Sequence, residues 1–289
     1  MRIAYVILFF CSIGCFNKGK QVEQAQGYFE KGKALEKVSR RLEEASGLVA
    51  SIRNPGMLWT HNDSGHPAEV FLIDTLGQIK MICKLDKIKS RDWEDITIGS
   101  GPEAGKNYLY VGDIGDNDSK YSVKLVYRFE EPVFDQKEKK IEVFDTLIIK
   151  LSDGVRDTEA MMIDPITKDW FIVSKREDSV RLYKMTYPYE ADTLIAEKIA
   201  ILPFQKIVAA NISPDGKELL MKDYSNVYYW KRSEGQSIPE LLKKTPVVLP
   251  YDAEMQGEAI CFRADGKGYY TLSESSESKQ AELMYYKRK

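Results

Sequence analysis

Short runs of apolar and aromatic residues alternate with turn signals along the chain from residue 38 onward. The turns include Asn54-Pro55-Gly56, Pro214-Asp215-Gly216 and Ala264-Asp265-Gly266. Short runs rich in Val, Ile, Tyr and Trp, bounded by Gly, Pro, Asn and Asp, are typical of β-strands. Since no amphipathic pattern continues for more than a few helical turns, the sequence predicts an all-β protein.

An acidic motif recurs at the beginning of three of these strand clusters. Asp92-Trp93-Glu94-Asp95, Asp157-Thr158-Glu159-Ala160 and Gln256-Gly257-Glu258-Ala259 each place a Glu two residues after a polar residue. An aromatic-rich strand follows each motif. Aligning all the units gives five equivalent positions on the first strands: Ser46, Glu94, Glu159, Ala210 and Glu258.

The repeat has a period of about 50 residues with four strands in each unit, which is the signature of a β-propeller. We predict five four-stranded blades. The fifth unit lacks a fourth strand, and we expect residues 37–42 to supply it, because this closes the ring and removes an exposed edge. Six blades are the alternative if residues 130–141 contain a strand pair. A two-sheet β-sandwich would leave the repeated Glu unexplained.

The N-terminus carries a targeting pattern. Met1-Arg2 supplies positive charge, and the apolar run over residues 3–10 is too short to span a bilayer. Ser12-Ile13-Gly14-Cys15 resembles a bacterial lipobox, in which the Cys becomes the lipidated first residue. We therefore expect a signal peptide at 1–15 with Cys15 lipidated, a polar tether at 16–36, and one propeller domain at 37–289. An ordinary secretory signal is the alternative.

This pattern predicts an extracytoplasmic protein anchored to a bacterial envelope membrane, either periplasmic or at the cell surface. The net charge of -2, with Lys and Arg spread evenly, gives no footprint for nucleic acid. We expect a monomer whose membrane contact is its N-terminal lipid. Cys83 and Cys261 lie in apolar runs, which favours buried thiols, although a disulfide stays open.

Repeated carboxylates on the first strands suggest a metal site. In a propeller these strands line the central channel, so the three Glu side chains would converge there. Converging carboxylates repel one another unless protons or a cation neutralise them, and oxygen-only clusters suit Ca²⁺. The predicted ligands are Glu94, Glu159, Glu258, Asp92, Asp113 and Asp157. The alternative is that each Glu bonds to neighbouring strands as a structural latch, which leaves no site.

The ends of the second strands form a further ring of mixed charge. We expect Asn62, Lys175, Arg176 and Lys222 to hold a small anionic or sugar-like ligand beside the metal. The same groups could instead neutralise one another as ion pairs.

Both histidines of the chain lie in His61-Asn62-Asp63-Ser64-Gly65-His66. A His beside an Asp permits general-base catalysis, so His61 and Asp63, with Lys175 and Arg176, are candidate catalytic residues. No GxSxG nucleophile motif is present, and Asn-Asp-Ser-Gly is also ordinary turn chemistry.

Six motifs are spread over the chain after residue 40: Leu58-Trp59-Thr60-His61-Asn62-Asp63-Ser64-Gly65, Asp92-Trp93-Glu94-Asp95, Tyr110-Val111-Gly112-Asp113-Ile114-Gly115-Asp116-Asn117, Asp157-Thr158-Glu159-Ala160, Ile212-Ser213-Pro214-Asp215-Gly216 and Gln256-Gly257-Glu258-Ala259-Ile260. Together they resemble a family of secreted bacterial propeller proteins of unassigned function. More distantly, the acidic first strands are similar to those of phytase-like and gluconolactonase-like propellers. In those families a channel-mouth Ca²⁺ assists hydrolysis of phosphate esters or lactones. This chain departs from the phytase pattern in having fewer blades and no dense run of Asp.

Three functions are therefore open. The first is a lipid-anchored propeller that binds a divalent cation, with calcium preferred, together with a small anionic or sugar-like ligand. The second is a metal-dependent hydrolase of phosphoesters, esters or lactones. The third is an envelope interaction module with no small-molecule site.

Overall fold

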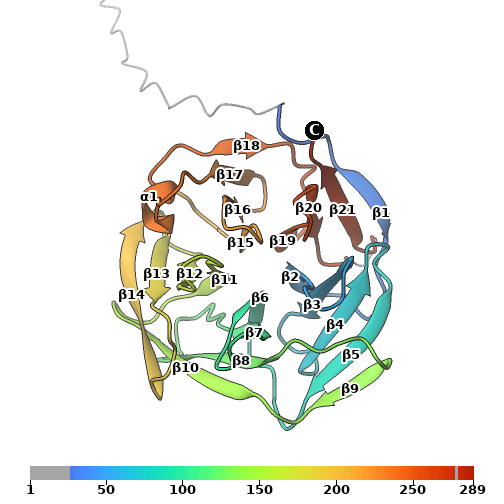
Figure 1. The fold of residues 1–289 in the computed structure, drawn as a ribbon, viewed down its shortest axis with the longest axis horizontal. Coiled ribbons are helices and arrows are strands. Elements are labelled where there is room, and N and C mark those ends of the chain that lie inside the picture. The colour runs from blue at the N-terminus through green and yellow to red at the C-terminus, as the bar shows by residue number, and fades with distance from the viewer. Residues whose placement is uncertain (1–26, 277–278) are drawn as a thin grey trace, which may run out of the picture.

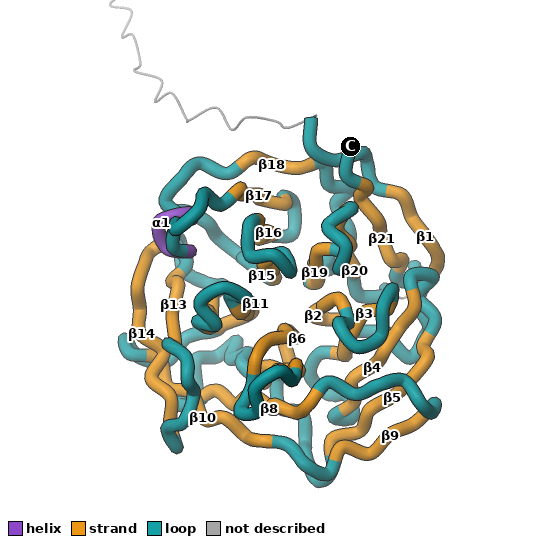
Figure 2. The backbone as a smooth tube through the Cα atoms, viewed as in Figure 1, coloured by secondary structure: helices purple, strands orange, loops and turns teal. Residues whose placement is uncertain are grey.

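The computed structural model describes residues 27–276 and 279–289, and almost all regular structure in them is β-strand (Figures 1 and 2). The described residues contain one helix, α1 (Ile238–Leu242), which begins at a capping box between Ser237 and Glu240. None of their helices has the length and apolar content needed to cross a bilayer. The prediction of an all-β protein is confirmed.

The strands pair into four hydrogen-bonded sheets. The first has the order β2 (Ala45–Ala50), β3 (Met57–Asn62), β4 (Glu69–Asp74), β5 (Ile79–Leu85), β9 (Glu138–Ile141). The second has the order β11 (Thr158–Ile163), β12 (Trp170–Ser174), β13 (Arg181–Met185), β14 (Thr193–Ile201), β10 (Asp145–Leu151), β8 (Lys124–Glu130), β7 (Asn107–Asp113), β6 (Trp93–Ser100). The third has the order β15 (Ala209–Ile212), β16 (Glu218–Lys222), β17 (Val227–Lys231), β18 (Val247–Leu249). The fourth has the order β1 (Lys33–Lys37), β21 (Glu282–Lys287), β20 (Gly268–Leu272), β19 (Ala259–Phe262).

The first strand of each predicted unit lies innermost, around the central axis of the ring (Figure 1). We call the region that these strands surround the channel. Neighbouring inner strands are in contact all the way round: β2 with β6, β6 with β11, β11 with β15, β15 with β19, and β19 with β2. The predicted first strands therefore line the channel, as a propeller requires.

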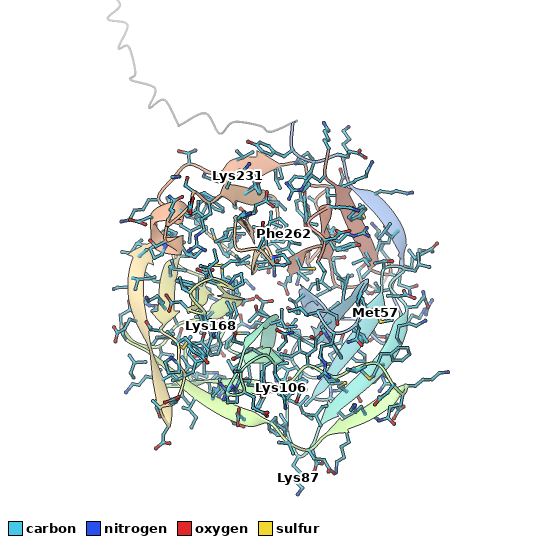
Figure 3. The ribbon with its side chains drawn as sticks, viewed as in Figure 1. Met57, Lys87, Lys106, Lys168, Lys231 and Phe262 are labelled. Atoms are coloured by element: carbon cyan, nitrogen blue, oxygen red, sulfur yellow. The ribbon has the colours of Figure 1, made fainter. Side chains whose placement is uncertain are left out.

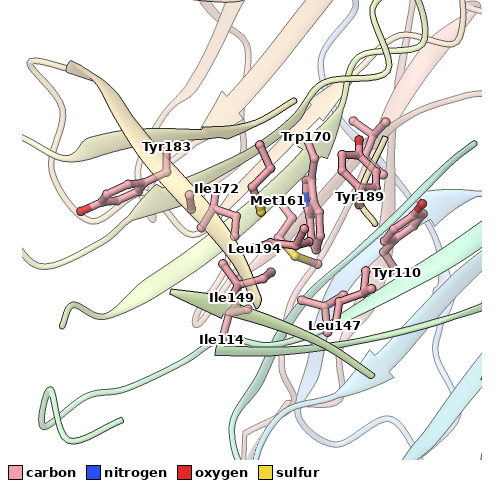
Figure 4. Close-up of a cluster of buried hydrophobic side chains, with 14 of the residues drawn as sticks. Tyr110, Ile114, Leu147, Ile149, Met161, Trp170, Ile172, Tyr183, Tyr189 and Leu194 are labelled. Carbon is pink, nitrogen blue, oxygen red and sulfur yellow. The ribbon is translucent and has the colours of Figure 1, made fainter. Parts of the chain in front are cut away.

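Large apolar side chains fill the spaces between neighbouring groups of strands. In one such cluster Tyr110 of β7 packs on Trp170 of β12 with ring centroids 5.3 Å apart, and Met161 lies beside them (Figure 4). Aromatic rings bury large areas, so they supply much of the stabilisation of this packing. Cys83 and Cys261 are buried free thiols in two different clusters, so the described structure has no disulfide between them.

One strand was not predicted, and another differs from its predicted position. Residues 130–141 contain the end of β8 and the single strand β9, which runs parallel to β5, rather than a strand pair. The outer strand beside β21 is β1, Lys33–Lys37, and not residues 37–42.

The N-terminal boundary of the propeller domain also lies earlier in the chain than predicted. Phe29 is buried between Tyr229 and Tyr269 and bridges to Arg288, so the described part of the expected tether (16–36) belongs to the sheet. Burial of an aromatic ring outweighs the polar character of its neighbours in sequence. Cys15 and the predicted signal peptide lie outside the described residues.

Candidate functional site

Two of the repeated Glu residues lie at β-bulges. The pairing of β6 with β7 shifts between Trp93 and Asp95, which leaves Glu94 as the extra residue. The pairing of β11 with β12 shifts in the same way between Thr158 and Ala160, at Glu159. A bulge redirects a side chain out of the regular pleat and is frequent beside functional sites.

Carboxyl groups crowd together at the end of the channel where the inner strands begin. Three overlapping groups each bring three ligand oxygens within 4.8 Å of one another: Asp63, Asp92 and Glu94; Asp63, Glu258 and Glu274; Glu94, Asp157 and Glu159. We call these seven residues the acidic end. The first and second groups share Asp63, and the first and third share Glu94, so the carboxylates form one continuous arc.

Crowding and burial together favour protonated carboxyls here. Burial, and after it the charge of Glu159, raises the pKa of Glu94 well above its usual range, and burial raises that of Glu159 to about 8. For Glu274 the pKa rises to about 8 through burial and the charge of Glu258, and for Asp63 burial with nearby carboxylates raises the pKa to about 7. Below its raised pKa each of these groups holds a proton unless a cation replaces it.

Lys175 supplies positive charge inside the arc. Its Nζ lies 2.9 Å from Glu159 Oε1 and 3.7 Å from Glu258 Oε1, and the side chain is 13% exposed. Burial alone would lower the pKa of Lys175, but the two carboxylates raise it above its usual value. Tyr224 donates a hydrogen bond to Glu258 from the same side. Glu159 and Glu258 are therefore partly neutralised by the protein itself.

Asp157 is held by protein donors. It accepts hydrogen bonds from the Asp116 backbone N–H at 2.8 Å and from Arg176 Nε at 2.6 Å. Arg176 also donates to Asn117, and its side chain is about half exposed. Arg176 thus borders the acidic end with part of its guanidinium in solvent.

Gly115 makes room for two of the carboxylates. A Cβ at this position would overlap Glu94 Oε1 and the carboxyl group of Asp92. Only glycine permits the backbone to approach both side chains so closely.

Four carboxyls of the arc have no ion-pair partner within the described residues: Asp63, Asp92, Glu94 and Glu274. Oxygen-only donors of this kind match the coordination of a hard cation such as Ca²⁺. The residues present therefore fit a divalent cation between Asp63 and its neighbours.

Some predicted site residues lie elsewhere. Asp113 is fully buried and accepts hydrogen bonds from the backbone N–H groups of Arg91 and Asp92 and from Arg91 Nε at 3.0 Å, so it joins strands instead of offering a ligand. Lys222 is buried, donates to the Gly257 carbonyl, and lies 4.7 Å from the Tyr251 ring, so its ammonium group is held by these neighbours and not by a carboxylate of the arc. Burial lowers the pKa of Lys222 to about 8.

The histidines also lie outside the arc. His61 is completely buried with its ring edge against Trp93, and burial lowers its pKa to about 4. Its Nδ1 lies 2.9 Å from the Asn62 carbonyl. His66 pairs with Glu44 at 3.1 Å, and Asn62 donates to the Arg41 carbonyl. None of these contacts places a general base against the carboxylates, which removes the basis for catalysis by His61.

The sequence did not single out Gly115 or Tyr224 as site residues. It placed Asp63 and Glu274 in the ring of mixed charge at the ends of the second strands, but it assigned Asp63 to catalysis and neither residue to metal binding. Asp63 directly follows β3, and Glu274 lies two residues after β20. Tyr224 was missed because it lies in a turn that only the folded ring brings beside Glu258.

The other end of the channel is different. Where the inner strands end, a cavity of about 770 Å³ is lined largely by apolar side chains, including Val49, Ile98, Ile163, Ile212 and Phe262. We call this the cavity end. Figure 3 places Phe262 close to the centre of the ring and Lys87 at its rim. From Glu94 to Ser100, β6 covers about 20 Å between the two ends.

No protein-family model and no curated protein sequence matches the chain. Among solved structures, the PQQ-bound aldose sugar dehydrogenase of Streptomyces coelicolor is similar, with 10% identity, a TM-score of 0.53, and coverage of 90% of this chain and 98% of that one. A gluconolactonase of Xanthomonas campestris has 10% identity, a TM-score of 0.50, and coverage of 89% of each chain. These matches confirm the predicted distant likeness to gluconolactonase-like propellers as a likeness of fold.

Proposed function

We propose that the acidic end binds a divalent cation, preferably Ca²⁺, and with it a small anionic or sugar-like ligand. The single observation that carries this proposal is the arc of overlapping carboxyl groups within 4.8 Å, four of which have no cationic partner among the described residues. Keeping so many carboxylates together at neutral pH costs free energy unless a cation or protons offset their repulsion.

Asp63 is the central ligand in this proposal, because it joins the cluster of Asp92 and Glu94 to the cluster of Glu258 and Glu274. Asp92 and Glu94 would complete one side and Glu258 and Glu274 the other. Ca²⁺ accepts six to eight oxygen ligands, so the carboxylates leave positions for ligand oxygens.

The half-exposed Arg176 and the ammonium group of Lys175 would hold the ligand beside the cation. Guanidinium and ammonium groups recognise carboxylate, phosphate and hydroxyl oxygens. The two similar structures are of an aldose sugar dehydrogenase and a gluconolactonase, which favours sugar-like molecules as the first ligands to test.

We extend the proposal to architecture and location. Five inner strands, two of which (β6 and β11) belong to the eight-stranded sheet, support five blades, and the pairing of β1 with β21 supports a ring closed by the N-terminal strand. The lipobox-like Cys15 supports a lipid-anchored protein outside the cytoplasm, at a bacterial envelope membrane.

Calcium titration of chelator-treated protein tests the cation site. At a free Ca²⁺ concentration of about 100 times Kd, stabilisation would be about 2.7 kcal/mol, which raises Tm by about 5–10 °C in a chain of this size. Asp63→Asn should lower the calcium affinity about tenfold or more, because it removes a shared charged ligand.

Asp118→Asn is the matched control. Asp118 is an exposed aspartate that pairs with Lys120, and it is not one of the seven residues of the acidic end. Calcium affinity should be unchanged in this variant. Equal melting temperatures with calcium and with chelator would refute the cation site, and an equal response of both variants would remove Asp63 from it.

Metal-assisted hydrolysis is the second candidate, favoured by the position of Lys175 between Glu159 and Glu258. The cation would polarise an ester, lactone or phosphoryl oxygen, and the ammonium group would stabilise negative charge that develops there. A panel of sugar lactones, simple esters and phosphoesters distinguishes the candidates. Turnover that needs calcium and is lost in Asp63→Asn supports hydrolysis, whereas calcium-dependent binding without turnover supports the binding protein. If neither calcium nor ligands bind, the remaining candidate function is an envelope interaction module.

A further inference from the structure

The chain enters the propeller at the cavity end. Phe29 pairs with Arg288, whose guanidinium lies 4.7 Å from the Phe29 ring. Arg288 in turn donates to the Gly266 carbonyl at 2.6 Å, and its backbone N–H donates to Lys267. Gly266 lies in the turn between β19 and β20, next to Arg263 and Asp265, which line the cavity. Residues 27–29 therefore lie at this end of the propeller.

From there the chain runs to the opposite end. β1 leads to Arg41 and Glu44, whose carbonyls accept hydrogen bonds from the Asn62 side chain and the Asp63 backbone. A full strand thus separates the tether attachment from the acidic end. An N-terminal anchor would therefore hold the cavity end nearer to the membrane.

Several exposed apolar side chains lie in the cavity lining or beside it. Ile52 is 49% exposed, Leu76 53% and Ile166 60%. Ile52 lines the cavity, whereas Leu76 and Ile166 directly follow Thr75 and Pro165, which line it. Phe134 is 38% exposed and is tied to the same face, because its backbone N–H donates to Asn54.

Charge differs between the two ends in the same sense. The acidic end gathers seven carboxyl groups against Lys175 and Arg176, so in its ionised state and without a bound cation it carries net negative charge, which an anionic bilayer repels. At the cavity end, Lys168 and Arg263 line the cavity together with Asp164 and Asp265, so the charges of the two signs are equal in number. An anionic lipid surface is therefore repelled less by the cavity end than by the acidic end.

We propose that the cavity end faces the bilayer, with Ile52, Leu76, Phe134 and Ile166 in contact with lipid, so that the acidic end opens away from the membrane. This orientation rests on the lipid anchoring proposed above. The anchor supplies the attachment, and these four exposed apolar side chains determine which face of the propeller lies against the lipid.

A pair of single-cysteine labels tests the orientation. Ile166→Cys and Met255→Cys replace side chains that are both 60% exposed, one on a turn at each end, and Cys83 and Cys261 are buried and resist labelling. Each full-length lipidated variant carries a bimane label in vesicles of phosphatidylethanolamine and phosphatidylglycerol. Lipids with a nitroxide at the headgroup side of the acyl chain then quench the label. Quenching at position 166 should exceed that at position 255 about threefold or more.

Three outcomes would overturn the orientation. Equal quenching at the two positions would show no preferred face, and stronger quenching at position 255 would reverse it. Protection of position 166 from aqueous iodide without quenching by lipid would place a protein partner on the cavity end. Ile52→Cys gives a second label at the cavity end if Ile166→Cys does not fold, which its melting curve shows.

Vesicle flotation separates the two proposals. Protein that floats but shows equal quenching keeps its anchor and loses the orientation. Protein that does not float, and whose labels are not quenched, refutes both the anchor and the orientation, whereas calcium binding is measured independently.

Discussion

The two ends of the channel are formed by the same inner strands, yet they have opposite chemistry. At one end β6 and β11 begin with bulged Glu94 and Glu159 inside a crowd of carboxyls; at the other they finish with Ile98 and Ile163 around an apolar cavity. Crowded charge costs free energy unless it is compensated, whereas apolar packing stabilises the fold directly. The difference teaches that stability comes from apolar packing between the strand groups, and that the acidic end is maintained at a cost.

Replacement of Lys175 by Met should have the largest effect. The variant leaves Glu159 and Glu258 buried without their ammonium partner, which should lower the free energy of unfolding by about 4 kcal/mol at pH 8 without calcium. Urea denaturation measures the change.

Measurements of this loss of stability at two pH values, and with calcium added, distinguish a charge effect from lost packing. At pH 5 the loss should shrink, because protonated carboxyls no longer need the ammonium group, and calcium should restore part of the stability at pH 8. A loss that is the same at both pH values would show that Lys175 acts through packing alone.

Phe262→Ala should disrupt the packing at the cavity end and leave calcium binding at the acidic end intact. Phe262 is 1% exposed at the end of β19, and its removal should cost about 3 kcal/mol of stability through lost burial and a larger void. Calcium affinity, measured by titration calorimetry, should stay within about twofold of the parent value, since no carboxyl is touched.

Phe262→Leu is the conservative partner, with a smaller loss of stability expected because most of the side-chain volume remains. A large fall in calcium affinity in either variant would show that the two ends are coupled through the inner strands.

A change of pH alone is milder than either substitution and should sharpen the comparison between the acidic end and the cavity end. The pKa of Glu159 is about 8 in the folded chain, and that of Glu94 is also raised, against about 4.3 for an unfolded Glu. Between pH 4 and 8 the folded protein therefore binds more protons than the unfolded chain, and its stability falls as pH rises. Each extra proton contributes a slope of about 1.4 kcal/mol per pH unit.

Urea unfolding in chelator at pH 5.5 and 7.5 measures this slope. Glu94→Gln should flatten the dependence, because an amide cannot titrate, and the calcium affinity of the parent should increase with pH as protons leave the site. Stability that increases between these two pH values would contradict the assignment of shared protons to the acidic end.

Much of this arrangement was predictable from the repeat. Turn signals and short apolar runs predicted an all-β propeller-like fold, and the recurrence of Glu at one strand position predicted that Glu94, Glu159 and Glu258 would converge. The structure brings these residues into overlapping groups, because equivalent positions in a ring of strands necessarily face one axis.

Other predictions failed because they depended on neighbours from distant parts of the chain. Asp113 has the same local pattern as a ligand, but Arg91 reaches it from the preceding loop. His61 stands in a polar stretch, yet Trp93 from the next strand group covers its ring. The outer strand at β21 was placed a few residues too late, because burial of Phe29 extends the domain toward the N-terminus.

By itself, then, the sequence determined the strand pattern, the repeat and the set of carboxylates that the repeat carries to one end of the channel. Only the tertiary structure decided which of these carboxylates are neutralised. Lys175 follows β12 and yet meets Glu258 from the start of β19, and Asp63 joins groups on both sides of the channel. The physical reason is that electrostatic energy depends on distances in space, whereas strand formation and alternation depend on residues that are close in sequence.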